Sequence, residues 1–151
     1  MISFLLFQFY YSSATSHMQE DAQPPSLPIY AQFPAKLSKI FTLLDSMTRG
    51  RDMARDYQVS TWGDVDFLVC RSDVRVPGLG TELSRKAVDI THQRGVRVIT
   101  AIASSNFSGR IFDKCSFDNV FSIKYDEYTE EGKVVFNTRE PHTHARLYVK
   151  H

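Results

Sequence analysis

A glycine-rich turn is the part of this sequence whose residue types and spacing are best suited to chemistry. Residues 75–81 read Arg-Val-Pro-Gly-Leu-Gly-Thr; they follow an apolar, strand-like segment (67–70) and open into a helix-like one (79–94). Backbone N–H groups at the start of a helix attract anions, because the helix dipole is positive at that end. Gly78 and Gly80 carry no Cβ, so a ligand can approach the main chain there. The turn predicts a phosphate site.

Two other glycine-rich phosphate motifs do not fit this turn. A dinucleotide-binding turn requires a third glycine where this chain has Leu83. A P-loop requires Gly-Lys followed by Ser or Thr, and no such sequence follows. A Gly-x-Gly turn that binds no ligand remains the alternative interpretation.

Hydroxyl and imidazole groups lie further along the chain. Ser104 and Ser108 are four residues apart, so we expect their hydroxyls on one helical face near the positive end of the helix. Ser104 or Ser105 could equally be a helix cap, and Ser108 could bond its own backbone. His142 and His144 form a His-x-His pair without a supporting Cys or carboxylate cluster. We therefore expect both histidines to pack in a loop or to face solvent, and we expect no metal site.

Composition and charge set further limits on function. A chain of 151 residues with 42% hydrophobic and 23% charged residues suits one ordinary globular domain. A net charge of +1 implies no general attraction to nucleic acid or to an acidic membrane, and it leaves the oligomeric state open. Cys70 and Cys115 give neither a disulfide framework nor a zinc spacing. Because both lie in apolar stretches, we expect buried free thiols and a reducing, cytoplasmic location.

The first 34 residues differ from the rest. Residues 1–11 are almost wholly apolar, too few to span a bilayer and without the basic residues that begin a signal peptide. A buried strand, a non-native leader and a secretory signal remain alternatives. Residues 19–34 contain four of the six prolines and read as a loop or linker. We expect residues 1–34 to be an apolar leader and proline-rich linker, either non-native or loosely packed, and residues 35–151 to be the folded domain.

Beyond residue 34, helical and strand-like segments alternate. We expect helices from residue 35 to about Gly50, over 79–94 with Gly95 as its cap, and after Ser104 or Ser105. Strands are expected at 65–74, 96–103, 120–125 and 145–150. The apolar residues expected to face inward are Leu37, Ile40, Phe41, Leu44 and Met47, then Leu79, Leu83, Ala87 and Ile90, then Phe107, Ile111 and Cys115. The order predicts an α/β fold, an α+β sandwich around a mixed sheet.

Three ordered motifs resemble one enzyme family. Besides the Arg-x-x-Gly-x-Gly turn, they are the segment 103–117 and the tail formed by Gly-Lys-Val-Val-Phe at 132–136, Pro141-His142 and Leu-Tyr-Val-Lys at 147–150. The turn resembles the pyrophosphate loop of the GCN5-related N-acetyltransferases (GNAT). The tail is similar to that of the insect-type arylalkylamine N-acetyltransferases. Together the matches cover about residues 35–150.

The resemblance implies an activity and a set of site residues. It implies transfer of acetyl from acetyl-CoA to an arylalkylamine such as dopamine or tryptamine, with no metal. Ser104 and Ser108 match serines that assist proton movement. The residues expected to bind acetyl-CoA are Val69, Cys70, Arg75, Val76, Gly78, Leu79, Gly80, Thr81 and Ser105.

The chain also departs from the family pattern. Pro77 lacks an N–H in the phosphate turn. Phe112 stands where many acetyltransferases have a tyrosine acid, and Ser116 replaces the glycine expected before Phe117. The family's amino-terminal strand, helices and hairpin, with their glutamate base, have no counterpart in residues 1–34, so we expect an incomplete GNAT fold. The alternative function is an inactive, truncated protein that binds acetyl-CoA without catalysis.

Overall fold

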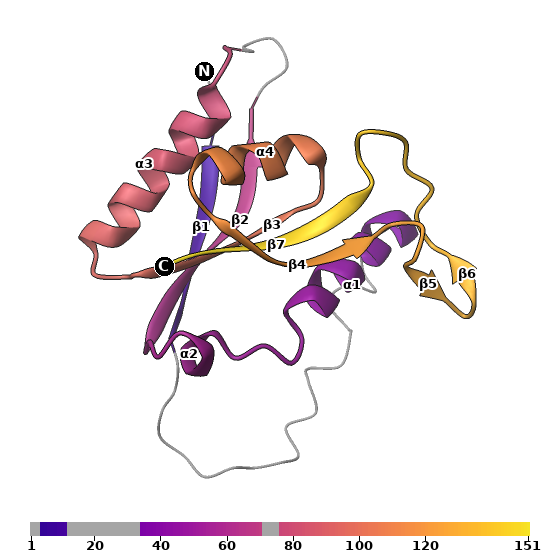
Figure 1. Cartoon of the computed structure of the whole chain (residues 1–151), viewed down its shortest axis with the longest axis horizontal. Coiled ribbons are helices and arrows are strands. Elements are labelled where there is room, and N and C mark those ends of the chain that lie inside the picture. Colours follow the sequence, from indigo (N-terminus) through magenta and orange to yellow (C-terminus); the bar gives the residue numbers. More distant parts are fainter. Residues whose placement is uncertain (1–3, 12–33, 71–75) are drawn as a thin grey trace.

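The structure is a computed structural model that describes residues 4–11, 34–70 and 76–151, the first of these ranges as backbone alone. It contains a five-stranded sheet in the order β1-β2-β3-β7-β4 and a small hairpin, β5-β6 (Figure 1). The elements are β1 (Phe4–Tyr11), α1 (Ala35–Thr48), α2 (Met53–Asp56), β2 (Thr61–Val69), α3 (Leu79–Gln93), β3 (Val98–Ala103), α4 (Asn106–Lys114), β4 (Asp118–Lys124), β5 (Thr129–Glu130), β6 (Lys133–Val134) and β7 (His144–Lys150).

The sheet is mixed, as the sequence predicts. β2 and β3 are parallel, and α3 forms the crossover between them. β1 pairs antiparallel with β2, and β7 lies antiparallel between β3 and β4. Residues 4–11 form the edge strand β1, and residues 1–3 lie outside the described residues. Residues 12–33 lie outside the described residues, so the division at residue 34 stays a prediction.

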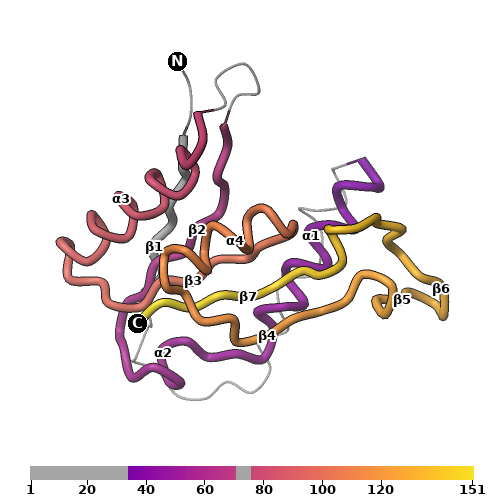
Figure 2. The backbone as a smooth tube through the Cα atoms, turned by 45° about the horizontal axis from the view of Figure 1, so that its top comes forward, coloured from indigo at the N-terminus to yellow at the C-terminus, as the bar shows by residue number. Residues whose placement is uncertain are grey.

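Helices cover both faces of the sheet, so the protein has two core layers (Figures 1 and 2). Alternate residues of β3 divide between these layers, as expected for a strand buried on both sides. Ile99, Ala101 and Ala103 pack beneath α3 and α4 with Phe112. On the opposite face, Val98 packs in a second cluster with residues of α1 and α2. This arrangement buries β3 between two layers of helices.

The inward faces of the helices differ from those that the sequence predicts. In α1, Leu43 and Met47 are buried, whereas Leu37 and Ile40 are exposed. In α4, Phe107 is 61% exposed and Phe112 is buried in its place. The buried residues of α3 are Thr81, Ser84, Val88 and Thr91.

The error in α3 has a physical cause. The prediction counted only apolar side chains and placed Ile90 inward, yet this side chain is 50% exposed. Thr91 is buried instead, because its hydroxyl donates to the carbonyl of Ala87 at 2.7 Å. A hydroxyl that bonds its own helix can be buried at low cost, and small side chains let the helix lie close to the sheet.

Among the described residues, no helix has both the length and the hydropathy needed to cross a bilayer.

Candidate functional site

The parallel strands β2 and β3 separate at their carboxyl ends. Their register runs from Trp62 opposite Val98 to Val65 opposite Ala101 and does not continue, although both strands extend further. β2 then leads toward α3, and β3 leads into α4, so the two helices begin on either side of the separation (Figure 1). Ligands of α/β sheets bind beyond the carboxyl ends of the strands, where neighbouring chains diverge.

The turn that begins α3 leaves several backbone donors available. Gly78 is the N-cap residue with φ of 86°, in the left-handed region, and no side chain caps this helix. The amide of Leu79 donates to the carbonyl of Val76 at 3.2 Å. Within the described part of the chain, the amides of Gly78, Gly80 and Thr81 have no such acceptor. These donors sit at the positive end of a helix of 15 residues.

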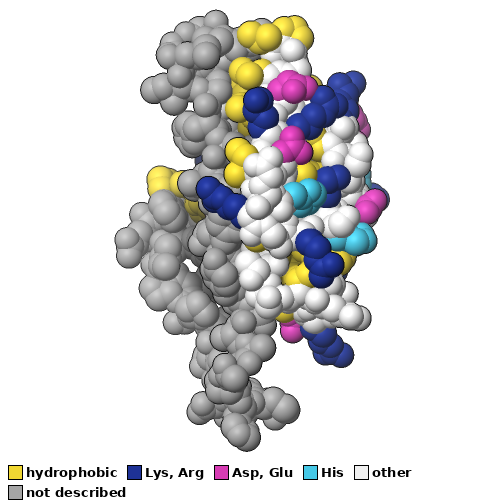
Figure 3. Space-filling model, turned by 90° about the vertical axis from the view of Figure 1, so that its left-hand side faces the viewer, with side chains coloured by type: hydrophobic (Ala, Val, Ile, Leu, Met, Phe, Trp, Pro, Cys, Tyr) yellow, Lys and Arg dark blue, Asp and Glu magenta, His cyan; other side chains and the backbone are white. Residues whose placement is uncertain are grey.

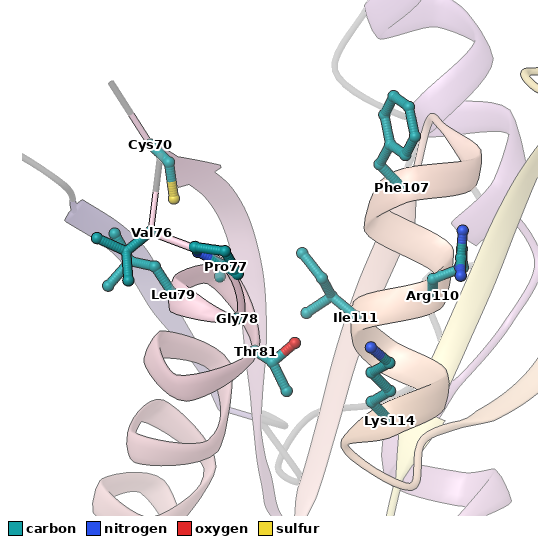
Figure 4. Close-up of a pocket in the computed structure, with 11 residues that line it drawn as sticks. Cys70, Val76, Pro77, Gly78, Leu79, Thr81, Phe107, Arg110, Ile111 and Lys114 are labelled. Carbon is teal, nitrogen blue, oxygen red and sulfur yellow. The ribbon is translucent and has the colours of Figure 1, made fainter. Parts of the chain in front are cut away.

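A cleft of about 470 Å³ lies between this turn and α4. Its lining residues are Cys70, Val76, Pro77, Gly78, Leu79, Gly80, Thr81, Phe107, Arg110, Ile111 and Lys114 (Figure 4). Six residues that the sequence assigned to acetyl-CoA binding therefore line one cleft: Cys70, Val76, Gly78, Leu79, Gly80 and Thr81. α4 supplies the opposite wall through Phe107, Arg110, Ile111 and Lys114, none of which the sequence analysis named as a site residue.

The two glycines of the turn have different roles. A Cβ added to Gly78 would have no atom within 4 Å, so this position is open as expected. A Cβ at Gly80 would lie 2.8 Å from Cδ1 of Ile111. The side of Gly80 on which a Cβ would stand is therefore occupied by Ile111 of α4, while Gly80 itself still lines the cleft. Gly80 lets the two helices converge and form the floor of the cleft.

Two cations on the α4 wall were not anticipated. Arg110 and Lys114 are four residues apart on α4, exposed, and both line the cleft. Among the described residues that line the cleft, none is acidic. Neither cation forms an ion pair with an acid among the described residues. The sequence signal was the i,i+4 spacing of two cations on a helix beside the turn, which becomes informative only once the two helices are known to be neighbours.

The serines form a cap at the start of α4. Ser105 is the N-cap: its hydroxyl oxygen accepts from the amide of Ser108 at 3.2 Å, and the hydroxyl of Ser108 donates to the carbonyl of Ser105 at 3.0 Å. The two hydroxyl oxygens are 3.0 Å apart. Ser104 precedes the helix, so the shared helical face expected for Ser104 and Ser108 is not formed. None of the three serines is among the residues that line the cleft.

The remaining binding residues of the prediction lie at the β2 end of the cleft. Val69 is the last residue of β2, 41% exposed, and is not among the lining residues. Cys70 is exposed, which corrects the expectation of a buried thiol, whereas Cys115 is buried as predicted. In Figure 4 the Cys70 sulfur points toward the turn. Arg75 lies outside the described residues.

A polar pair on the opposite face of β2 also corrects the prediction. Asp64 stands at the start of the strand that the sequence predicts, where a carboxylate is expected to face water, but it is half-buried and accepts a hydrogen bond from the hydroxyl of Thr100 on β3. Burial raises the pKa of Asp64 to about 6, Thr100 opposes this rise, and the neighbouring charge of Asp66 adds to it. Asp64 and Val65 are consecutive in β2 and point to opposite faces of the sheet. Because helices cover both faces, the face with Asp64 is not open to solvent.

His142 and Phe112, which the sequence analysis singled out, both pack against aromatic side chains. His142 packs its ring edge-on against Phe107, with centroids 4.9 Å apart, and its Nδ1 accepts from the amide of Asn106 at 3.3 Å. Phe112 is buried between the rings of Phe117 and Tyr148. A tyrosine hydroxyl at position 112 would therefore lie in the core. His142 packs at the start of α4, consistent with the loop packing expected from the sequence.

The described residues contain no group of three or more His, Cys, Asp or Glu side chains that could hold a metal ion. A second hollow of about 560 Å³ lies beside the end of β4 and mixes both signs of charge, with Lys124, Asp126, Glu140 and His144 among its lining residues. The face that α3 presents likewise mixes basic and acidic side chains (Figure 3). In the described part of the chain, the first cleft differs because its charged lining residues, Arg110 and Lys114 of α4, are both cations.

Known structures share this architecture over nearly the whole chain. Arylalkylamine N-acetyltransferase 2 from Aedes aegypti matches with a TM-score of 0.81 and 23% identity over 98% of the chain. A mosquito arylalkylamine N-acetyltransferase, like 5b, matches with a TM-score of 0.75 and 20% identity over 99% of the chain. The polyamine N-acetyltransferase of Drosophila melanogaster, which forms N-acetylagmatine, matches with a TM-score of 0.70 and 18% identity over 97% of the chain.

The matches cover nearly the whole of this chain but only about two thirds of each known structure. The chain spans 66% of the length of the Aedes aegypti enzyme and 68% of each of the other two. No protein-family model matches the chain. At these identities the comparison establishes the fold. The mixed sheet, the uncapped glycine turn and the flanking helices thus give the chain the GNAT acetyltransferase fold, shared with insect arylalkylamine and polyamine N-acetyltransferases.

Proposed function

We propose that this protein is an N-acetyltransferase that binds acetyl-CoA in the cleft between α3 and α4 and transfers the acetyl group to an arylalkylamine, with dopamine and tryptamine as representative substrates. The observation that carries the proposal is the uncapped start of α3. Its free amides open on a cleft that is otherwise lined mostly by apolar groups and two cations. A diphosphate is the kind of anion that such a helix start binds.

The donor set fits the diphosphate of coenzyme A. The amides of Gly78, Gly80 and Thr81 would donate to its oxygens, as far as the packing of Ile111 over Gly80 permits. Pro77 contributes no donor. The apolar parts of Val76 and Ile111 would contact the pantetheine chain, which extends toward Cys70 at the end of β2. The sulfur would then lie near the separation of β2 and β3.

The reaction requires two proton movements. An amine with a pKa near that of lysine, about 10.4, must lose a proton before its nitrogen attacks the thioester carbonyl. The C–N bond forms, the C–S bond breaks, and the departing thiolate accepts a proton to leave as the thiol of CoA. Ser108 is the proposed donor to the thiolate and Ser104 a proposed relay. Ser105 supports Ser108 through the hydroxyl contact of 3.0 Å.

A second candidate is a protein that binds acetyl-CoA without turning it over. The specific observation in its favour is the engagement of Ser105 and Ser108 in the cap of α4, because a hydroxyl committed to its own helix is less available to a substrate. Both candidates bind acetyl-CoA in the cleft, and they differ in whether the acetyl group is then transferred to an amine.

Turnover separates the two candidates. The purified full chain is mixed with acetyl-CoA and a panel of dopamine, tryptamine, agmatine and spermidine; thiol release and the mass of the acetylated amine are followed together. Thiol release with the acetylated arylalkylamines supports the first candidate. Binding of acetyl-CoA by calorimetry without product supports the second. If acetyl-CoA neither binds nor reacts, the cleft has another ligand and both candidates fail.

A further inference from the structure

Tyr125, the residue that follows β4, reaches across to the start of α4. Its hydroxyl donates to the carbonyl of Ser104 at 2.6 Å. The side chain is only 6% exposed, and its ring packs edge-on against Phe136 with centroids 5.5 Å apart. The amide of Tyr125 donates to the carbonyl of Thr143 at 3.0 Å. Packing and backbone contacts therefore fix this ring, and its hydroxyl is held on one acceptor.

A single peptide unit connects Tyr125 to the serine cap. The carbonyl of Ser104 and the amide of Ser105 belong to the same planar peptide. Its oxygen accepts from Tyr125, and its N–H donates to the hydroxyl oxygen of Ser108 at 3.3 Å. Hydrogen bonds in such a chain polarise one another, so the bond from Tyr125 to the carbonyl strengthens the donation by the amide. The hydroxyl of Ser108 is thus coupled to a buried tyrosine on another element.

We propose that Tyr125 is a positioning residue for acetyl transfer, which acts through this peptide to make Ser108 a better proton donor to the sulfur of CoA. This inference rests on the proposed function. As the C–S bond breaks, its electron pair stays on the sulfur and Ser108 gives the sulfur a proton; the serine then regains the proton that the attacking amine loses. A hydrogen bond received by the serine oxygen stabilises the negative charge that develops there during the transfer.

Tyr128 offers a matched control on the same loop. Its ring also packs against Phe136, with centroids 5.6 Å apart. Its hydroxyl lies beside Ser46 of α1 rather than at the cap of α4. Phenylalanine at position 125 or at position 128 therefore removes one hydroxyl from the same aromatic cluster, but only the change at 125 removes the bond to the cap.

The test follows thiol release by the full chain with acetyl-CoA and tryptamine, with activity corrected for the folded fraction from urea denaturation. We expect Tyr125→Phe to lower kcat about tenfold and to leave KM for acetyl-CoA within about twofold. The solvent deuterium isotope effect on kcat should rise, because proton transfer to the sulfur becomes slower. In the Ser108→Ala background the same change should lower kcat no further, since the group on which Tyr125 acts is gone. Tyr128→Phe should keep the wild-type kcat and isotope effect.

The outcomes separate this inference from the proposed function. If Tyr125→Phe keeps the wild-type kcat, or keeps the wild-type isotope effect while kcat falls, the inference is wrong and the proposed function stands. The inference is also refuted if the losses from Tyr125→Phe and Ser108→Ala multiply in the double variant, or if Tyr128→Phe slows turnover equally, because the effect is then one of packing. If the wild type releases no thiol with any amine of the panel, the proposed function fails and this inference fails with it.

Discussion

α3 and α4 both begin beside the cleft, but their first turns are built differently. α3 begins at a glycine in the left-handed conformation and has no side-chain cap. α4 begins at Ser105, whose hydroxyl exchanges hydrogen bonds with Ser108 in a complete capping box. The same difference recurs at their far ends, where Gly95 follows α3 and Ser116 follows α4, both with positive φ. The two helices thus use glycine and serine for equivalent positions.

The difference supports the start of α3, and not that of α4, as the proposed anion site. Every helix leaves its first amides without partners inside the helix. At the start of α4 the serine hydroxyls of the capping box provide hydrogen-bond partners, so this helix start requires no ligand. At the start of α3 the first amides have no acceptor among the described residues, and this helix start opens on a cleft. An uncapped helix start of this kind is a preformed anion site, whereas a capped one contributes stability.

The largest expected effect comes from capping α3 artificially. Gly78→Asp places a carboxylate at the N-cap, where it accepts from the first amides and repels a diphosphate. Because hydrogen bonds to a charged group are worth about 1.5–3 kcal/mol, we expect a loss of acetyl-CoA affinity of about 100-fold or more. Calorimetric titration with acetyl-CoA measures the loss.

Gly78→Ala is the matched control for that experiment. No atom lies within 4 Å of the added Cβ, so the only cost is the left-handed conformation, roughly 1 kcal/mol of unfolding free energy. Affinity for acetyl-CoA should change by less than about threefold. If both variants bind acetyl-CoA like the wild type, the turn is not the phosphate site.

A smaller effect is expected where the two helices touch. In Gly80→Ala the new Cβ displaces Cδ1 of Ile111, which then narrows the cleft. We expect acetyl-CoA affinity to fall about tenfold, while unfolding free energy changes by less than about 1 kcal/mol because alanine favours the helix.

Adding Ile111→Val removes the displaced methyl group and should restore most of the affinity. Rescue by the double variant would confirm that the loss is steric and transmitted from α4. A loss that persists in the double variant would instead indicate that ligand atoms contact Gly80 directly.

Local signals in the sequence predicted the bounds of α3 and the turns at its two ends, although not its buried face. Gly95 was assigned as a left-handed cap and has φ of 80°, and the turn at Gly78 was identified from the residue types alone. Such features depend on a few consecutive residues, so the sequence contains what is needed to find them. The order of elements followed from the same kind of local pattern, and β7 begins within one residue of its predicted start.

The features that depended on long-range packing were missed. Asp64 was expected to face water because it flanks the start of a predicted strand, and nothing local reveals that both faces of the sheet are covered. Lys114 joins the site only because α4 lies across from the turn, a relation between segments more than thirty residues apart. Ser104 and Ser108 had the right spacing, but the helix begins between them. Spacing identifies a shared helical face only when both residues are in the helix.

The serine cap of α4 should affect stability more than binding. Ser105→Ala removes the acceptor for the amide of Ser108, and loss of an N-cap costs about 1 kcal/mol of unfolding free energy. Urea denaturation measures that cost, and acetyl-CoA affinity should be unchanged. Ser108→Ala removes the other half of the box and, under the proposed mechanism, also slows acetyl transfer. If Ser105→Ala and Ser108→Ala slow turnover only in proportion to the protein they unfold, the serines are structural and the non-catalytic candidate gains support.

The smallest expected effect is at the far ends of the helices. Ser116 has φ of 58°, a conformation that a residue with a Cβ adopts at a cost, whereas the equivalent residue after α3 is glycine. Ser116→Gly should raise unfolding free energy by about 0.5–1 kcal/mol, since the relief of strain is partly offset by the greater freedom of glycine in the unfolded chain.

Gly95→Ser should lower the unfolding free energy by a similar amount, because no atom lies within 4 Å of the added Cβ and only the conformation is penalised. Lys150 donates to the carbonyls of Cys115 and Ser116 at 3.1 and 3.3 Å, and these backbone contacts survive the change to glycine. Opposite signs in paired urea denaturation curves would show that the glycine–serine difference at the far ends concerns stability alone; equal signs would mean that Ser116 is held by interactions that compensate its strain.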